Sequence, residues 1–153
     1  MPVRSLPLAF IEVRAISHAT ENLEKVMTAL QNVISSEILD EVQISREQLE
    51  GHFGNPIVLM KARVNRKSGI RKMTEELFNR LPRQELEKLS SDLERRIDED
   101  GNFYIRLDKQ AAYRGEIRLG EFDVIRLQFK FSLPKRQRQQ VIEASRQLIL
   151  QTT

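Results

Sequence analysis

Apolar and polar residues alternate along several short stretches of the chain, and this alternation predicts β-strands. The stretches are 8–16, 57–64, 103–108 and 124–131, with a weaker one at 41–45. In the first stretch the residues expected to face a core are Ala9, Ile11, Val13 and Ala15, while Glu12 and Arg14 point away. Strands with one apolar and one polar face are typical of an antiparallel sheet that is covered on one side.

Other stretches repeat apolar residues every three or four positions, which predicts amphipathic helices. The three repeats are Leu23, Val26, Met27, Leu30, Val33 and Ile34; then Leu86, Leu89, Leu93 and Ile97; then Val141, Ile142, Leu148 and Ile149. Thr20 is expected to cap the first helix, and Pro82 to break a helical region over 68–97. The pattern predicts an α+β fold: a two-layer sandwich with a largely antiparallel sheet and helices on one face, as a single domain over 1–153.

Composition excludes several classes of protein. The chain has 153 residues and no cysteine, so disulfide frameworks, zinc ribbons and thiol nucleophiles are excluded together. No apolar stretch approaches the roughly 20 residues that a membrane span requires. We therefore expect a cytoplasmic protein without a membrane partner.

The formal net charge of +3 conceals a segregation of charge. Residues 61–72 hold six cations and no acid, and residues 126–146 hold six cations and Glu143 alone. Segregation of this kind favours a basic surface for an anionic partner, although solvated faces of helices and strands produce it too. The polar faces of the predicted strands carry Arg14, Lys61, Arg63, Tyr104, Arg106, Arg126, Gln128 and Lys130, with Glu12 and Asp108 as exceptions. Such a face suits the phosphates of RNA better than its bases, because Tyr104 is its one aromatic.

Three further segments are candidates for anion or RNA contact. Pro134 is expected to open the last helix, and Lys135, Arg136 and Arg138 would then stand at a helix N-terminus, where cations are unfavourable unless an anion is bound. The segment 51–57 (GHFGNPI) combines two glycines with the donors of His52 and Asn55, but it also fits a tight strand connection. The segment 108–118 forms either a polar cluster or a charge-balanced loop.

Enzyme motifs are not found. The two histidines, His18 and His52, lack ligand spacing, and neither a phosphate-binding glycine loop nor a nucleophile elbow is present. The acidic turn Asp98–Asp100 could hold a divalent cation, but such turns are far more often solvated. We expect no catalytic residue, no metal and no cofactor.

Two long stretches strongly resemble a family of archaeal proteins. They are GHFGNPIVLMKARV (51–64) and DEDGNFYIRLDKQAAYRGEIRLGEFDVIRLQFKF (98–131), and the HATE segment 18–21 fits the same pattern. The family is one of predicted RNA-binding proteins related to the exosome, with a fold similar to ribosomal protein L5. The resemblance implies a two-layer fold and favours RNA over DNA.

The sequence therefore predicts a non-catalytic RNA-binding protein, an accessory of RNA processing or of the exosome, that grips mainly the phosphate backbone. The alternatives are an adaptor that docks on an acidic subunit of an RNA-processing complex and, more remotely, a metal-dependent nuclease. The candidate RNA-binding residues are His52, Asn55, Lys61, Arg63, Arg106, Lys109, Arg114, Arg118, Arg126, Lys130, Lys135, Arg136 and Arg138.

Overall fold

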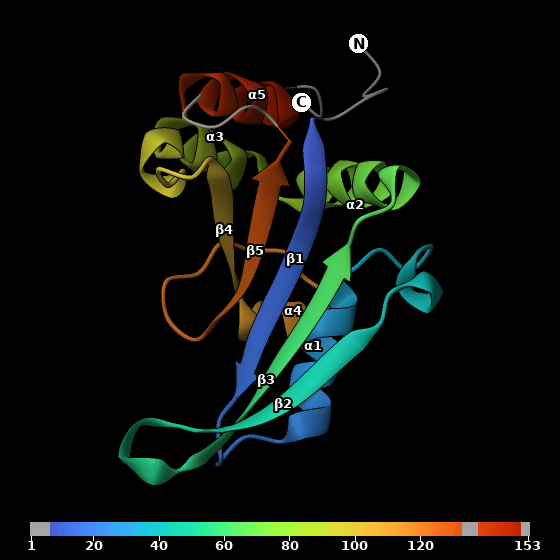
Figure 1. Ribbon diagram of the computed structural model, residues 1–153, viewed down its shortest axis with the longest axis vertical. Helices are drawn as coiled ribbons and strands as arrows, with labels where there is room; N and C mark the ends of the chain where they lie inside the picture. The colour runs from blue at the N-terminus through green and yellow to red at the C-terminus, as the bar shows by residue number, and fades with distance from the viewer. Residues whose placement is uncertain (1–6, 133–137, 151–153) are drawn as a thin grey trace.

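The structure, a computed structural model, describes residues 7–132 and 138–150. Within these residues one antiparallel sheet of five strands has the order β2-β3-β1-β5-β4. The strands are β1 (Leu8–Ser17), β2 (Ile44–Glu50), β3 (Pro56–Val64), β4 (Asn102–Asp108) and β5 (Val124–Phe131). The helices are α1 (Leu23–Val33), α2 (Lys67–Arg80), α3 (Arg83–Ser91), α4 (Lys109–Tyr113) and α5 (Arg138–Leu150). Figure 1 looks onto the sheet with α1 and α4 behind it, which confirms the predicted α+β class.

The core lies between the sheet and the helices. The four strands β3, β1, β5 and β4 each turn one apolar face toward the helices. Val13, Leu127 and Ile105 on this face are fully buried. The ring of Phe129 packs between two others, 5.5 Å from Phe103 and 6.2 Å from Phe78 of α2. Large buried rings dominate the energetics of a core, so this cluster fixes β4 and β5 against the helical layer.

The strand pattern differs from the prediction at two places. Ala9 was expected to face the core but is exposed, because the register of β1 against β5 shifts between Leu8 and Phe10. The extra residue of this bulge moves Leu8, not Ala9, to the buried face. The strand predicted at 41–45 is present but lies further along the chain: Leu39–Glu41 forms a 3-10 helix, and the strand runs from Ile44 to Glu50.

The first helix begins two residues later than Thr20 predicts. Asn22 is the N-cap, and its side-chain oxygen accepts hydrogen bonds from the backbone N–H groups of Glu24 and Lys25. Three residues of its apolar stripe, Val26, Leu30 and Ile34, are buried as predicted. The helix is joined to α4 through the side chain of Asn32 at its far end.

The break at Pro82 is confirmed, since α2 ends at Arg80 and α3 starts at Arg83. The segment 109–120, which the pattern did not assign, opens with the short helix α4 and then runs back along the edge of β4. There Gly120 lies so close that a Cβ atom would stand 2.9 Å from the backbone of Asp108. Among the described residues, no helix has both the length and the apolar character that crossing a membrane would require.

Candidate nucleic-acid interface

Four cationic side chains form a row across the open face of the sheet. Arg14 of β1 stands directly opposite Lys61 of β3 on one side and Arg126 of β5 on the other. Arg126 in turn stands opposite Arg106 of β4. Adjacent strands are about 4.8 Å apart, so the row spans about 14 Å. We call these four residues, Lys61, Arg14, Arg126 and Arg106, the cation row.

Three of the four members of the cation row have no acidic partner among the described residues. Like charges that stand directly opposite one another destabilise a sheet, by a few tenths to about 1 kcal/mol for each pair. Lys61, Arg106 and Arg126 have no ion pair with any carboxylate of the described residues, and only Arg14 has one, to Glu12. The row therefore has unmet capacity for an anion.

Glu12 lies on the open face two residues before Arg14 and stands opposite Arg63. Among the described residues it is the one buried acid. It is 6% exposed, and its two oxygens accept from Arg63 Nη2 at 2.9 Å and from Arg14 Nη2 at 3.2 Å. Burial alone would raise the pKa of Glu12, but the hydrogen bond from Arg63 and the charges of both arginines outweigh it, so the pKa lies below its usual value. The carboxylate thus stays charged and orients both guanidinium groups.

The aromatic rings of this face support arginines. The guanidinium of Arg63 lies 4.0 Å above the ring of Phe10, and that of Arg126 lies 4.9 Å from the ring centre of Tyr104. Such cation–π contacts hold a guanidinium in place. Burial and the neighbouring Asp98 raise the pKa of Tyr104, whose hydroxyl is hydrogen-bonded to that carboxylate. The rings of this face therefore position the guanidinium groups of Arg63 and Arg126.

The open face extends beyond these two rows. Lys130 of β5 stands opposite Phe10 and Asn102, and Gln128 donates from Nε2 to Asn102 Oδ1 at 3.0 Å. The eight residues that the sequence places on the uncovered face are therefore on one face of the sheet. The six cations among them come from four strands that are far apart in the chain.

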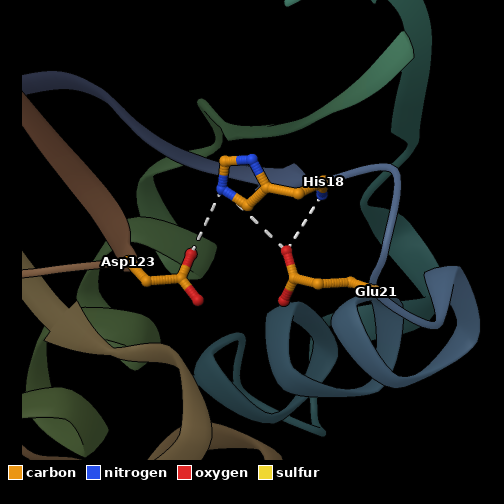
Figure 2. A group of neighbouring side chains, drawn as sticks. All are labelled: His18, Glu21 and Asp123. Carbon is orange, nitrogen blue, oxygen red and sulfur yellow. Dashed lines mark hydrogen bonds and ion pairs between the residues drawn. The ribbon is translucent and has the colours of Figure 1, made fainter. Parts of the chain in front are cut away.

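Lys109 does not belong to this surface. Its side chain is 3% exposed, and its ammonium donates to Ile16 O at 2.7 Å and to Glu21 Oε1 at 3.0 Å and pairs with Asp123 Oδ1 at 2.7 Å. Glu21 and Asp123 are two members of the one His, Asp and Glu cluster of the described residues that could hold a metal ion; the third is His18. His18 Nε2 lies 3.5 Å from Asp123 Oδ1 and 4.0 Å from Glu21 Oε1 (Figure 2). The ammonium of Lys109 therefore occupies the place that a cation would take between these carboxylates.

Other candidate residues are also engaged elsewhere. Arg114 and Arg118 both pair with Glu116, at 3.6 and 3.8 Å, in the loop after α4, which favours the charge-balanced loop for this segment. Arg138 is the first residue of α5, and its guanidinium donates to the carbonyl oxygens of Glu94 and Ile97. These contacts satisfy Arg138 within the fold, so we leave it out of the proposed interface, together with Lys109, Arg114 and Arg118.

The remaining candidates lie in turns or outside the described residues. His52 and Asn55 belong to the turn that joins β2 to β3, which is the tight strand connection that the sequence offered as one of two interpretations, and Asn55 is exposed. Pro134, Lys135 and Arg136 lie outside the described residues. The acidic turn is closed upon itself, because the carboxylate of Asp98 accepts from the N–H groups of Asp100 and Asn102.

Sequence reasoning missed the anchoring role of Lys109, although a signal was present. Lys109 is the first residue of a helix, where the macrodipole disfavours a cation. An acidic partner close by would resolve that conflict, and Asp123 supplies one. The roles of Glu12 and Phe10 depend on the strand register, which the sequence alone does not fix.

These features define a class: an α+β domain whose open sheet face carries a row of four cations, three of which have no acidic partner among the described residues. The model of the RNA-binding family matches residues 10–131, so the chain belongs to that family. It is 37% identical to an RNA-binding protein of Pyrococcus abyssi over 90% of each chain, and 34% identical to an uncharacterized protein of Methanocaldococcus jannaschii over 87% of this chain and 92% of the other. The crystal structure of a DUF54 protein from Archaeglobus fulgidus superposes with a TM-score of 0.82 at 34% identity, covering 92% of this chain and 99% of that one.

Proposed function

We propose that this protein binds RNA without catalysing a reaction on it, and that the cation row grips the phosphate backbone. The observation that carries the proposal is the alignment of Lys61, Arg14, Arg126 and Arg106 on adjacent strands. Protein stability alone disfavours such an arrangement, because each neighbouring pair repels. A polyanion lying across the strands reverses the sign of that interaction. Membership of the RNA-binding family and the similarity to the Pyrococcus abyssi protein support RNA as the polyanion.

Lys130 and Arg63 extend the proposed interface along the strands, since both lie on the same face as the row. Arg63 is held by Glu12 and Phe10, so its guanidinium is oriented before RNA arrives. His52 and Asn55 stay in the proposal as contacts at the β2–β3 turn.

The test is the binding of a short labelled RNA, measured by fluorescence anisotropy over a range of salt concentrations. Each phosphate contact contributes a slope of about −0.7 to −0.9 in log K against log salt, so four contacts predict a slope of about −3. Lys61→Glu and Arg106→Glu are expected to weaken binding strongly and to reduce the slope. Arg83→Glu is the matched control, because Arg83 is an exposed cation on α3 in the helical layer.

A slope near zero, or an equal loss of affinity in Arg83→Glu, would overturn the proposal. Binding of an acidic protein subunit without any affinity for RNA would favour the adaptor instead. RNA that is cleaved in the presence of magnesium, with cleavage lost when Asp108 or the acidic turn is replaced, would favour the nuclease. We expect the RNA to remain intact.

We also propose that the protein works in the cytoplasm as an accessory of RNA processing or of the exosome. The resemblance described above supports this role. The test is co-purification of exosome subunits with the tagged protein, before and after ribonuclease treatment. Their absence in both conditions would refute the exosome link and leave RNA binding untouched.

A further inference from the structure

We propose that a cavity between α1 and α4 takes up one unstacked nucleobase of the bound RNA. This inference rests on the proposed function, since the sheet face would hold the backbone while the cavity holds a base. The cavity has a volume of about 390 Å³. The residues of its lining that the argument uses are Glu21, Lys25, Val26, Lys109, Gln110 and Tyr113.

The lining combines the groups that a base requires. Tyr113 is 40% exposed and provides an aromatic wall, and the buried side chain of Val26 provides an apolar floor. Gln110 is exposed and offers an amide, which both donates and accepts, and no described residue engages it. A base has apolar faces and a polar edge, so a ring, an apolar floor and an amide match it.

The charge of the cavity favours a neutral group inside and a phosphate outside. Lys109 lies at the cavity, but its ammonium is already bound by Glu21 and Asp123. The exposed Lys25 is the remaining cation of the lining, and its ammonium lies 5.7 Å from the ring centre of Tyr113. This loose contact lets Lys25 turn outward to the phosphate of a nucleotide whose base lies against the ring.

The aromatic rings on the sheet are not available for stacking with a base. Arg63 covers Phe10 and Arg126 covers Tyr104, so a guanidinium already lies where a base would stack. Phe53 and Phe122 are highly exposed, but neither lines this cavity. Tyr113 is therefore the ring that combines exposure with a bounded cavity.

The walls of the cavity are held in place without a ligand. Asn32 of α1 donates from Nδ2 to the carbonyl oxygens of Ala112 at 2.9 Å and Tyr113 at 3.3 Å, which joins the two helices. Asp108 caps α4 by accepting from the N–H of Ala111 at 2.8 Å. Preformed sites of this kind avoid the entropic cost of ordering on binding.

The cavity also lies beside the end of β1, the strand that carries Arg14 of the cation row. The ammonium of Lys109 contacts the carbonyl of Ile16 in β1, and Ile16 is two residues beyond Arg14. Two residues of a strand span about 7 Å. An RNA strand that leaves the row at Arg14 and follows β1 can therefore turn around the end of that strand toward the cavity on the helical side.

The first experiment titrates ¹⁵N-labelled protein with adenosine 5′-monophosphate and, separately, with ribose 5-phosphate, which lacks the base. We expect saturable chemical-shift changes in the amide signals of residues 20–26 and 109–113 with adenosine 5′-monophosphate but not with ribose 5-phosphate. Tyr113→Ala and Gln110→Ala are expected to abolish or weaken them, and Tyr113→Phe to preserve them. Equal shifts with ribose 5-phosphate, or none with the nucleotide, would overturn the inference.

The second experiment measures the binding of a short single-stranded RNA. Stacking of a base on an aromatic ring is worth about 1–3 kcal/mol, so Tyr113→Ala is expected to weaken binding about 5- to 150-fold. The salt slope should not change, because no phosphate contact is removed. If RNA binds with the expected slope but Tyr113→Ala and Gln110→Ala leave the affinity unaltered, the base cavity is refuted while the phosphate grip stands. If RNA does not bind but the nucleotide still saturates the cavity, the proposed function fails instead.

Discussion

Arg14 and Arg126 stand directly opposite each other on β1 and β5, on the open face of the sheet. Two guanidinium groups in such a pair repel, and Glu12 relieves only Arg14 through an ion pair. Arg126 instead lies over the ring of Tyr104. The sheet therefore carries an electrostatic strain across its middle, and RNA would relieve it.

Removing one charge from the row should stabilise the free protein and weaken its binding to RNA. Arg106 is the most exposed member of the row and faces Arg126. We expect Arg106→Gln to raise the free energy of unfolding at low salt by about 0.2–1 kcal/mol, and less at high salt, where charges are screened. Denaturant unfolding at two salt concentrations measures this. Arg118→Gln is the control, because Arg118 has an acidic partner and its loss should bring no gain. If Arg106→Gln is less stable than the wild type at low salt, the cations of the row do not destabilise the free protein by repelling one another.

Most of the strand pattern could be read from the sequence because each strand of the open sheet alternates. The stretch 124–131 coincides with β5, and its residues Arg126, Gln128 and Lys130 lie on the open face as expected. Alternation fixes which face a side chain takes, but not which residue stands opposite it. The alignment of the cation row depends on the register in which neighbouring strands pair. The sequence therefore indicated which residues lie on the open face but not which of them stand opposite one another.

The acid stability of the protein should depend on Glu12. Its folded pKa lies below the usual value, so its contribution to stability is complete above the unfolded pKa of about 4.3 and is lost as the pH falls through the lower, folded value. Glu12→Gln should therefore show a shallower loss of stability in acid than the wild type. At neutral pH the substitution should cost about 1–3 kcal/mol, since it leaves two arginines without their buried partner.

Thermal unfolding between pH 3 and pH 7, at about one-unit steps, tests this expectation. The exposed Glu121 supplies the control, and Glu121→Gln should follow the wild-type profile. Identical acid profiles for Glu12→Gln and the wild type would show that the carboxylate is not selectively stabilised in its charged form.

The buried ammonium of Lys109 should be important for folding and irrelevant to the phosphate grip. Lys109→Met leaves Glu21, Asp123 and the carbonyl of Ile16 without their common donor. Because the two carboxylates are partly exposed, we expect a loss of about 2–4 kcal/mol, somewhat below that for a fully buried pair. RNA affinity measured at a temperature where the variant is folded should remain close to that of the wild type. A large loss of affinity in the folded variant would return Lys109 to the interface.

A smaller residue at position 109 should convert the same cluster into a metal site. In the wild type the ammonium lies between Glu21 and Asp123, so zinc is expected to leave the melting temperature unchanged. Lys109→Ala removes the ammonium and leaves His18, Glu21 and Asp123 with ligand atoms within 4.8 Å of one another. Zinc binds His and carboxylate ligands, so it should raise the melting temperature of Lys109→Ala. The double variant with His18→Ala should lose this response. A zinc effect of equal size in the wild type would show that the ammonium does not fill the site.

Two of the features that the sequence did not reveal depend on contacts between distant segments, and a third is local. Lys109 meets Asp123 and the end of β1 only because α4 starts beside the loop that leads into β5. Ala9 was misassigned because a bulge adds one residue and reverses the faces beyond it. Thr20 is a good N-cap residue, but Asn22 is better placed to reach the N–H groups of Glu24 and Lys25. Tertiary packing therefore decided the first two features, and the third was a local choice between two good N-cap residues.

Tyr104 should affect RNA binding only through Arg126. The guanidinium of Arg126 covers the ring of Tyr104, and the hydroxyl of Tyr104 is hydrogen-bonded to Asp98. We therefore expect Tyr104→Phe to bind RNA as the wild type does. Tyr104→Ala removes a cation–π contact of about 0.5–1 kcal/mol and should weaken binding about two- to fivefold. In an Arg126→Ala background, the change of Tyr104 to Ala should then have no further effect. The affinities of the four proteins of this double-mutant cycle give the answer. Additive losses would mean that the ring contacts RNA directly, because a ring that only supports Arg126 has nothing left to contribute once the guanidinium is gone.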